Sequence, residues 1–421
     1  MSVFATMESE VRSYSRAWPT VFTTAQGAEL RDANGRTYLD FFAGAGALNY
    51  GHNPPELKAA LLEYLTGDGI THGLDMHTTA KGTFLERLRD LVLTPRALDY
   101  RVQFPGPGGT NAIEAALKLA RKVTGRHTVG YFERGFHGMT LGALAVTANP
   151  AKRAGAGVPL PHTVPLPFDD PADDDQRAVT RLVQALETAV TDGRLAAVVV
   201  ESVQGEGGVN PARPAWLRTL ASWAREHGTL LVADDIQMGC GRTGPFFSFE
   251  TSGIVPDIVC LSKSISGYGM PMALTLIRPE HDVWCPGEHN GTFRGYNPAF
   301  VTATRALEVF WSDGALQART AALADRVHRS LTETARRHGL SAPRGRGLAW
   351  GLVLDRPGAA REVCDAAYRA GLLLETAGLQ DEVVKLLPPL TVTDGQMERG
   401  LAVLDEAVAT VADTGDLAIR P

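Results

Sequence analysis

The chain has 421 residues, and its 41 Lys and Arg against 47 Asp and Glu give it a net charge of −6. Hydrophobic residues make up 44% and charged residues 21%, a balance typical of a folded globular protein rather than a disordered one. The mild acidity comes without any block of Lys or Arg, which argues against a nucleic-acid partner or an anionic membrane surface.

The four cysteines, Cys240, Cys260, Cys285 and Cys364, are scattered along the chain. We expect neither a disulfide framework nor a metal site from them, and a reducing cytoplasm is the predicted location. The N-terminal segment has no apolar core of signal-peptide length, and no apolar run approaches the ~18 residues that span a bilayer. The sequence therefore predicts neither secretion nor membrane insertion.

Short apolar runs alternate with helical periodicity through the middle of the chain. Strands are predicted at Arg101–Phe104, Val129–Phe132, Ala196–Glu201, Thr229–Asp234 and Asp257–Leu261. Helical spacing is found at Asn111–Val123 and Ala215–Glu226. This alternation predicts an α/β fold with a doubly wound, mainly parallel central sheet, which binds its ligands at the carboxyl ends of the strands.

A glycine-rich turn, Pro105–Asn111, separates the first of these strands from the following helix. Glycines allow a ligand to approach the backbone, and the helix N-terminus offers free N–H groups to a phosphate. The turn matches neither the GxxxxGK[ST] loop nor the GxGxxG fingerprint, so nucleotide binding is not indicated. An ordinary tight connection is the alternative.

Two carboxylates, Asp234 and Asp235, follow four apolar residues. One of them is expected at the ligand-binding edge of the sheet, where a carboxylate can keep a heterocyclic nitrogen protonated. The alternative is a strand-end aspartate that caps the next turn.

Lys263 stands two residues after the run Asp257–Leu261. Burial penalises the charged form of a lysine and lowers its pKa, which makes the amine nucleophilic, as a Schiff-base lysine requires. The alternative is a lysine at a strand end that reaches solvent.

The pattern changes after about residue 310. A long helical segment, Ala318–His338, precedes strand-like stretches at Gly347–Leu354 and Val383–Leu387 and a last helix near Gly395–Ala409. Residues 311–421 are therefore predicted to form a smaller α+β domain beside a large domain of residues 46–310. Residues 1–45 are expected to pack with the small domain and the active site.

In their order along the chain, these features resemble the class III (ω-amino acid) aminotransferases of fold type I. The resemblance rests on Asp234–Gln237, Gly241–Gly244 and Ser262–Lys263, with further matches at Phe136–Gly138, Glu201–Gly208 and Gly291–Phe293. It covers nearly the whole chain. It implies a fold type I transferase that depends on pyridoxal 5′-phosphate and transfers amines by a ping-pong mechanism.

The resemblance also implies the residues around the cofactor ring. Lys263 would hold the cofactor as the internal aldimine and move the reacting proton. Asp234 would keep the pyridine nitrogen protonated, and Gln237 would bind the phenolic oxygen. Phe136 would stack on one face of the ring and Ile236 would pack on the other.

The remaining cofactor residues follow from the same resemblance. Gly109 and Thr110 would bind the phosphate, while His137 and Glu201 would complete the site, His137 as structural support rather than as a general base. Thr292 would reach the phosphate of a neighbouring subunit. The resemblance therefore implies a homodimer with shared active sites, or a larger assembly built from it.

Three residues are candidates for binding the amino acid and 2-oxo acid substrates. Glu206 matches a glutamate that covers an arginine in related enzymes when no carboxylate is bound. Lys385 occupies the position of that arginine and cannot form its planar two-point contact, so glutamate would be held differently. Arg16 lies where related enzymes bring the N-terminal segment over the active site, and we expect it to bind a substrate carboxylate.

Four further stretches resemble one subfamily of this class, namely residues 41–52, 68–72, 153–158 and 287–295. That subfamily converts L-2,4-diaminobutyrate and 2-oxoglutarate to L-aspartate 4-semialdehyde and L-glutamate, and the reverse reaction begins ectoine synthesis. Transamination of ornithine, acetylornithine or 4-aminobutyrate is an alternative. So are diaminobutyrate supply for a siderophore or peptide, and an aminomutase or racemase on the same fold.

Overall fold

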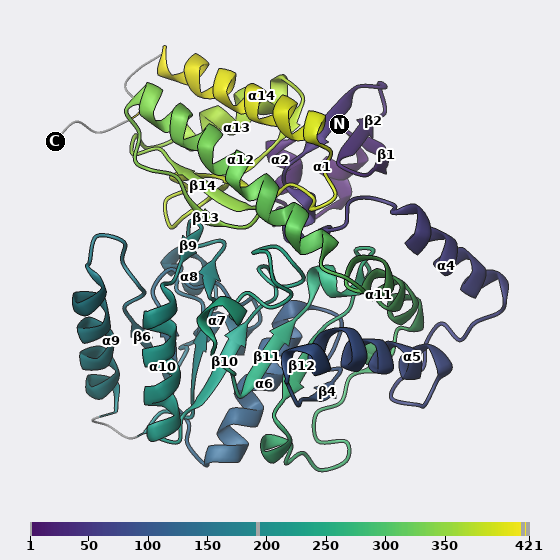
Figure 1. Cartoon of the computed structure of the whole chain (residues 1–421), viewed down its shortest axis with the longest axis vertical. Helices are drawn as coiled ribbons and strands as arrows, with labels where there is room; N and C mark the ends of the chain where they lie inside the picture. The colour runs from purple at the N-terminus through teal and green to yellow at the C-terminus, as the bar shows by residue number, and fades with distance from the viewer. Residues whose placement is uncertain (1, 191–193, 414–416, 418–421) are drawn as a thin grey trace.

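The computed structural model describes residues 2–190, 194–413 and 417. Figure 1 shows a large sheet with its helices in the lower part of the molecule, and a smaller sheet with its own helices in the upper part. None of the helices within these described ranges is long and apolar enough to cross a membrane.

The large sheet has seven strands in the order β4-β12-β11-β10-β7-β5-β6. β12 runs antiparallel to both of its neighbours, and the remaining pairs are parallel, so the prediction of a mainly parallel sheet is confirmed. The strands are β4 (Arg101–Gln103), β5 (Val129–Phe132), β6 (Thr163–Leu166), β7 (Ala197–Val200), β10 (Leu230–Asp234), β11 (Ile258–Leu261) and β12 (Leu274–Ile277). Two of them, β6 and β12, were not predicted from the sequence.

Both faces of this sheet are covered, which explains the continuous apolar runs. Successive side chains of a strand point to opposite faces. In β10, Leu230 and Val232 pack in the core under α6 (Gly109–Thr124). Leu231 and Ala233 pack in the opposite core with α10 (Pro214–Glu226). A parallel sheet buried on both sides therefore needs apolar residues at every position.

The smaller sheet has the order β13-β14-β17-β16 and lies at the top of Figure 1. All neighbouring strands in it are antiparallel. They are β13 (Arg344–Arg346), β14 (Ala349–Val353), β16 (Glu375–Ala377) and β17 (Val383–Leu386). The helices that cover it are α12 (Ala315–His338), α13 (Ala359–Arg369) and α14 (Asp394–Ala412).

The N-terminal strands form a third sheet that includes a strand from the C-terminal part of the chain. β1 (Phe22–Gln26), β2 (Glu29–Asp32) and β3 (Thr37–Asp40) form an antiparallel meander. β15 (Leu372–Leu373) pairs with β3 in parallel. Backbone hydrogen bonds thus join the first forty residues to the strand that precedes β16. The division at residues 45 and 310 stays a prediction, and its outer segments include residues outside the described ranges.

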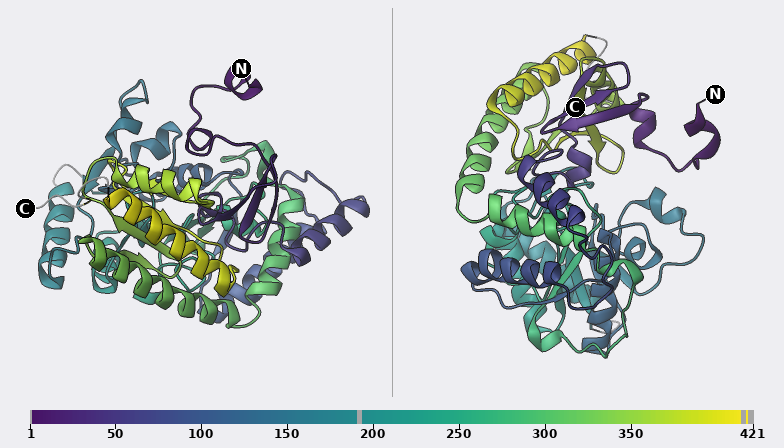
Figure 2. Two further views of the ribbon diagram at one scale, coloured as in Figure 1. Left: turned by 90° about the horizontal axis from the view of Figure 1, so that it is seen from above. Right: turned by 90° about the vertical axis from the view of Figure 1, so that its right-hand side faces the viewer.

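Most of the other helices and strands are short or lie at the periphery, whereas α11 packs into the core. In the right-hand view of Figure 2, the first helix extends away from the body of the molecule. These elements are α1 (Val3–Met7), α2 (Tyr14–Ala17), α3 (Ala43–Gly46), α4 (Pro55–Thr66), α5 (Thr79–Arg87), α7 (Leu141–Ala145), α8 (Pro150–Ala154), α9 (Asp175–Ala189), α11 (Asn297–Phe310), β8 (Val203–Gln204) and β9 (Asn210–Pro211).

A buried arginine fixes the upper part of the molecule on the lower part. Arg242 is fully buried and donates hydrogen bonds to the carbonyls of Leu348 and Pro388 and to Asn49 Oδ1. These acceptors come from segments far apart in the sequence. Both Nη atoms find acceptors, whereas the buried Nε has none among the described residues. The three bonds made by the Nη atoms hold these segments together beside the sheet edge.

Candidate active site

A cavity of about 180 Å³ lies at the carboxyl ends of the parallel strands. All but three of the predicted site residues line it. These lining residues are Gly109, Thr110, Phe136, His137, Glu201, Glu206, Asp234, Ile236, Gln237 and Lys263, together with Gly138 and Met238. The sequence pattern gave no reason to select Met238, which is an apolar residue in a buried loop.

The sheet topology explains why these residues meet. Asp234 ends β10, and Lys263 follows the end of β11 by two residues. Glu201 comes directly after β7, and the segment of Phe136 and His137 follows β5. Parallel strands present their carboxyl ends at one edge, so residues more than a hundred positions apart converge there.

Lys263 enters the cavity from a strained backbone position. Its φ of 53° lies in the left-handed region, which is costly for a residue with a side chain and is found at functional sites. Burial lowers the pKa of Lys263, although the carboxylates of Glu206 and Glu375 oppose this effect. No described residue accepts a hydrogen bond from its amine. A partly desolvated, unpaired amine is suited to nucleophilic and proton-transfer chemistry.

Asp234 and His137 form a buried pair on one side of the cavity. His137 Nδ1 lies 2.7 Å from Asp234 Oδ2, and Asp234 Oδ1 accepts the backbone N–H of Ile236 at 3.1 Å. Burial alone would favour a neutral ring, but the hydrogen bond and charge of Asp234 raise the pKa of His137. The imidazole therefore holds the carboxylate in place and stabilises its negative charge.

Glu201 connects two loops of the site. Its Oε2 accepts the backbone N–H of Phe136 at 3.1 Å, and its Oε1 accepts that of Gly205 at 3.2 Å. Burial raises the pKa of Glu201 to about 7. The carboxyl group thus ties the segment of Phe136 to the segment that ends in Glu206.

Three features of the cavity fit pyridoxal 5′-phosphate, namely the wall at Gly109, the start of α6 and the side chain of Gln237. A Cβ on Gly109 would lie 3.0 Å from Ile236 Cγ2, so only glycine leaves this wall open. The N–H groups of Gly109 and Thr110, at the start of the sixteen-residue helix α6, have no acceptor among the described residues. Such a helix start suits a phosphate. Gln237 Oε1 is buried without a donor, while its Nε2 binds Ala45 O at 2.9 Å.

Phe136 is half-buried, and its ring has a cation beside it. Lys152 Nζ lies 4.5 Å from the ring centroid. This lysine was not selected from the sequence, and its place beside Phe136 depends on the fold around α8. The contact is of the cation–π type and stabilises the orientation of the ring.

Lys385 is buried beside Glu206, just outside the residues that line the cavity. Its Nζ lies 2.6 Å from Glu206 Oε1 and 3.0 Å from Glu375 Oε1. Burial opposes ionisation of Glu206, but Lys385 and Lys263 nevertheless hold the pKa of Glu206 at about 2. Glu375 was missed in the sequence, where its signal was a lone acid after Leu372-Leu373-Leu374.

Arg16 and Thr292 do not line this cavity. The exposed side chain of Arg16 bonds the Glu10 carboxylate and the carbonyl of Arg12. Thr292 is exposed, and its carbonyl accepts from His72 Nε2 at 2.7 Å. Tyr14, two residues before Arg16, packs against Phe42 with ring centroids 4.8 Å apart. Burial and the charges of Glu375 and Glu206 raise the pKa of Tyr14.

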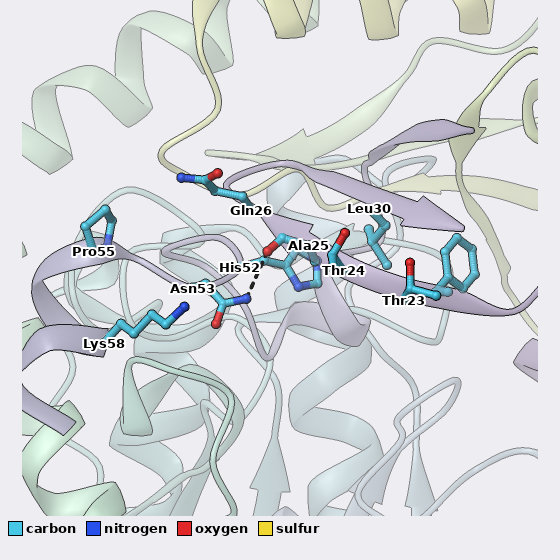
Figure 3. A pocket seen from close by; sticks show the side chains of 10 residues that line it. Thr23, Thr24, Ala25, Gln26, Leu30, His52, Asn53, Pro55 and Lys58 are labelled. Atoms are coloured by element: carbon cyan, nitrogen blue, oxygen red, sulfur yellow. Dashed lines mark hydrogen bonds between the residues drawn. The ribbon is translucent and has the colours of Figure 1, made fainter. Parts of the chain in front are cut away.

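A second cavity of about 730 Å³ lies between β1 and the start of α4 (Figure 3). Thr23, Gln26 and Lys58 are among its lining side chains, and Asn53 Nδ2 donates to Ala25 O at 2.9 Å. The ring of His52 is paired with Asp40 at 2.7 Å. None of the predicted site residues lines this open groove, so it is separate from the candidate active site.

The aminotransferase class-III family matches residues 11–408 of the chain. A protein of Nocardia farcinica named diaminobutyrate–2-oxoglutarate transaminase is 60% identical over 411 residues, which cover 97% of this chain and 94% of that protein. A protein of Streptomyces anulatus with the same name is 57% identical, with 98% of each chain covered.

Solved structures give the same family from the fold. The ornithine aminotransferase of Toxoplasma gondii superposes with a TM-score of 0.85 at 26% identity, covering 98% of this chain and 94% of that one. An amine transaminase from an uncultivated Pseudomonas species, in its pyridoxal-phosphate-bound form, has a TM-score of 0.84 at 25% identity and covers 96% of this chain and 98% of that one. The chain belongs to the aminotransferase class-III family, whose members are enzymes that depend on pyridoxal 5′-phosphate.

Proposed function

We propose that this enzyme interconverts L-2,4-diaminobutyrate and 2-oxoglutarate with L-aspartate 4-semialdehyde and L-glutamate by a ping-pong mechanism. The observation that carries the substrate assignment is the 50–60% identity, over nearly the full chain, to relatives named for this reaction. Ectoine synthesis is the pathway we propose for the product. Supply of diaminobutyrate to a siderophore or peptide would use the same reaction.

The proposal assigns roles to the residues of the cavity. When bound, pyridoxal phosphate supplies an aldehyde that carries the amine between the two substrates and a ring that accepts electrons. The free amine of Lys263 would hold the cofactor and then move a proton at the reacting carbon. Asp234, supported by His137, would keep the ring nitrogen protonated.

The other lining residues would bind and orient. Phe136 and Ile236 would enclose the ring, and the orphaned oxygen of Gln237 would accept from the phenolic hydroxyl. Gly109 and Thr110 would hold the phosphate at the start of α6. Glu201 would support Phe136 through the backbone.

Lys385 would bind a substrate carboxylate once Glu206 moves from it. Lys385 carries its charge because Glu206 and Glu375, despite burial, raise its pKa. As a point charge it offers one contact rather than the planar pair of an arginine. Arg16 remains a candidate for the diaminobutyrate carboxylate only if the α2 segment turns its side chain toward the cavity.

The proposal includes a homodimer in which Thr292 reaches the partner's phosphate. Thr292 lies outside the cavity of its own chain, and the adjacent Phe293 is 65% exposed. The ring of His72 contacts Phe293, and Ile70, Leu74 and Met76 beside it are exposed as well. Such an apolar patch is typical of a protein interface. Hybrid dimers of Lys263→Ala and Thr292→Ala chains would recover one intact site if this is correct.

The proposal also includes a cytoplasmic location and the domain division at residues 45 and 310. The four free cysteines support the location, because a reducing compartment keeps thiols free. The second proposed boundary coincides with the end of α11 at residue 310, and this supports the division.

The experiment that tests the function is a comparison of amine donors. The purified enzyme would be mixed with 2-oxoglutarate and L-2,4-diaminobutyrate, ornithine, acetylornithine or 4-aminobutyrate, and glutamate would be measured. We expect kcat/KM for diaminobutyrate to exceed the others at least tenfold. Equal or better use of another amine would overturn the substrate assignment.

A further inference from the structure

The two substrates of the proposed reaction place opposite demands on one region. L-Glutamate brings a second carboxylate to the far end of the cavity, whereas L-2,4-diaminobutyrate brings an ammonium group together with its carboxylate. A fixed positive charge would favour the first and repel the second. The question is which group lets the same site accept both, and this inference rests on the proposed function.

The structure places two carboxylates on one buried cation. Glu375 and Lys385 are directly opposed residues of the β16–β17 pair, so their side chains share one face of the hairpin. Lys385 Nζ lies between Glu206, which lines the cavity, and Glu375, which lies behind it. The side chain of Lys385 has no exposed surface, and that of Glu375 is 8% exposed.

The contact between Lys385 and Glu375 leaves one oxygen unsatisfied. Although Nζ is 3.0 Å away, Glu375 Oε1 receives no hydrogen bond of acceptable geometry from any described residue. A buried, ionised oxygen without a donor is costly. The carboxyl group can remove that cost either by taking up a proton or by meeting a cationic ligand.

The other charged and titratable groups around Glu375 do not remove the excess negative charge. Burial and the neighbouring Glu206 raise the pKa of Glu375, and Lys385 and Lys263 oppose the rise, so that the pKa is about 7. Tyr14 from α2 faces the cluster with a neutral hydroxyl, because burial and both carboxylates raise its pKa. Cys364 from α13 faces it as a neutral thiol, whose pKa is raised by burial. The cation of Lys385 is therefore shared by two acids.

We propose that Glu375 is a specificity-determining residue that takes up one proton from solvent when a substrate carboxylate replaces Glu206 on Lys385, and stays ionised when the substrate brings an ammonium group. The displaced Glu206 still lines the cavity, so without that proton three carboxylates would lie near one ammonium. With it, the charge balance at Lys385 is preserved. When the carboxylate leaves, Glu375 returns the proton to solvent.

The first test measures proton uptake with a dicarboxylate that cannot react. Glutarate would be titrated into the holoenzyme by calorimetry at pH 8, in two buffers of different ionisation enthalpy. We expect about one proton taken up per glutarate in the native enzyme and none in the Glu375→Gln enzyme. Below pH 6, where Glu375 already carries its proton, the two enzymes should bind glutarate equally well. Absence of proton uptake in the native enzyme would overturn the proposal.

The second test separates the two half-reactions. In the native enzyme the KM for glutamate should rise with pH, by a factor that approaches ten per pH unit for one linked proton. In Glu375→Gln this KM should be lower than in the native enzyme at pH 8 and should no longer rise with pH. The KM for diaminobutyrate should rise by about tenfold, because the cluster beside the cavity loses the surplus negative charge that attracts the substrate ammonium. A parallel change in both KM values would indicate a merely structural effect and would contradict the proposal.

Two further variants keep the result interpretable. Glu382→Gln makes the same chemical change at the other end of the β16–β17 hairpin, and should alter neither proton uptake nor the KM values. Glu375→Asp retains an ionisable group and should restore proton uptake. If the native enzyme uses another amine better than diaminobutyrate, the proposed function is wrong. If it prefers diaminobutyrate but takes up no proton with glutarate, only this inference is wrong.

Discussion

The site contains two buried ionic clusters that differ in charge balance. His137 and Asp234, at the carboxyl ends of the large sheet, form one acid and one base joined at 2.7 Å. Lys385, Glu206 and Glu375, at the small sheet, form one base with two acids. The charges of the first cluster cancel when His137 is protonated.

The second cluster lacks that balance. Among the described residues, none donates a well-formed hydrogen bond to Glu375 Oε1, and Glu206 of this cluster also lines the cavity. A cluster with surplus negative charge responds to the charge of an incoming ligand, whereas a balanced one resists it. The difference indicates that the large sheet supplies constant electrostatics for the cofactor, and the small sheet supplies variable electrostatics for the substrates.

Lys263 lies between the two clusters, and its removal should have the largest effect. The charges of Glu206, Lys385, Glu375 and Asp234 all act on its amine. We expect Lys263→Ala to lower kcat by about 10⁴-fold or more, because the proton-transfer group is lost. Borohydride reduction followed by peptide mapping should find the cofactor on the Lys263 peptide in the native enzyme only. Lys58→Ala, at the separate groove of Figure 3, is the matched control and should retain activity.

Breaking the balanced cluster should have the next largest effect. Asp234→Asn keeps the shape of the side chain but removes the charge opposite His137, and kcat should fall about 10²–10³-fold. The matched variant is Asp235→Asn, whose native carboxylate accepts from Ser248 N instead of facing the cavity. An equal fall of kcat in the two variants would show that the loss comes from changing a buried carboxylate and not from removing the charge in the cavity.

Removing the base of the unbalanced cluster should change substrate binding more than turnover. In Lys385→Met the two acids lose their shared cation, and the KM for glutamate should rise about 10- to 100-fold with a smaller change for diaminobutyrate. The fold should also lose about 3 kcal/mol of stability at pH 8, because unpaired buried carboxylates remain. Chemical denaturation and steady-state kinetics measure the two effects. Lys385→Arg should recover most of the binding, and a failure to do so would exclude charge as the cause.

The smallest expected effect is a pH dependence of stability. Burial raises the pKa of Asp235 to about 7, so the folded state binds more protons than the unfolded state between the ordinary pKa and that value. Stability should therefore fall as pH rises through 7, by about 1 kcal/mol per pH unit at most. In thermal unfolding, the Tm of Asp235→Asn should rise relative to the Tm of the native enzyme between pH 6 and pH 8. A Tm difference between the two enzymes that stays constant from pH 6 to pH 8 would contradict the raised pKa of Asp235.

The parallel strands and the residues at their ends could be predicted because each carries a local signal. The apolar runs before Asp234 and Lys263 end where β10 and β11 end, within a residue of the predictions. β12 was missed because its short run, Leu274–Ile277, lies among glycines and prolines and pairs antiparallel with the preceding strand β11 and the distant strand β4. Nothing local marks such a partner.

The placement of Arg16 shows that the approach of a segment to the site does not tell which of its side chains faces the site. Its segment does approach the cluster, but Tyr14 is the residue whose ionisation responds to Glu375 and Glu206. A helix turns about 100° per residue, so two positions along α2 point to different sides. Only the three-dimensional packing of that short helix selects which side chain faces inward.

The sequence by itself determined the α/β architecture, the lysine, the aspartate and the glycine-rich helix start, because strand periodicity and strand ends are local properties. The tertiary structure alone placed Glu375 against Lys385 and Glu206. That arrangement depends on the register of the β16–β17 hairpin and on the docking of the small sheet over the large one. Charges that meet across such distances in the chain interact through space, and no local pattern encodes their separation.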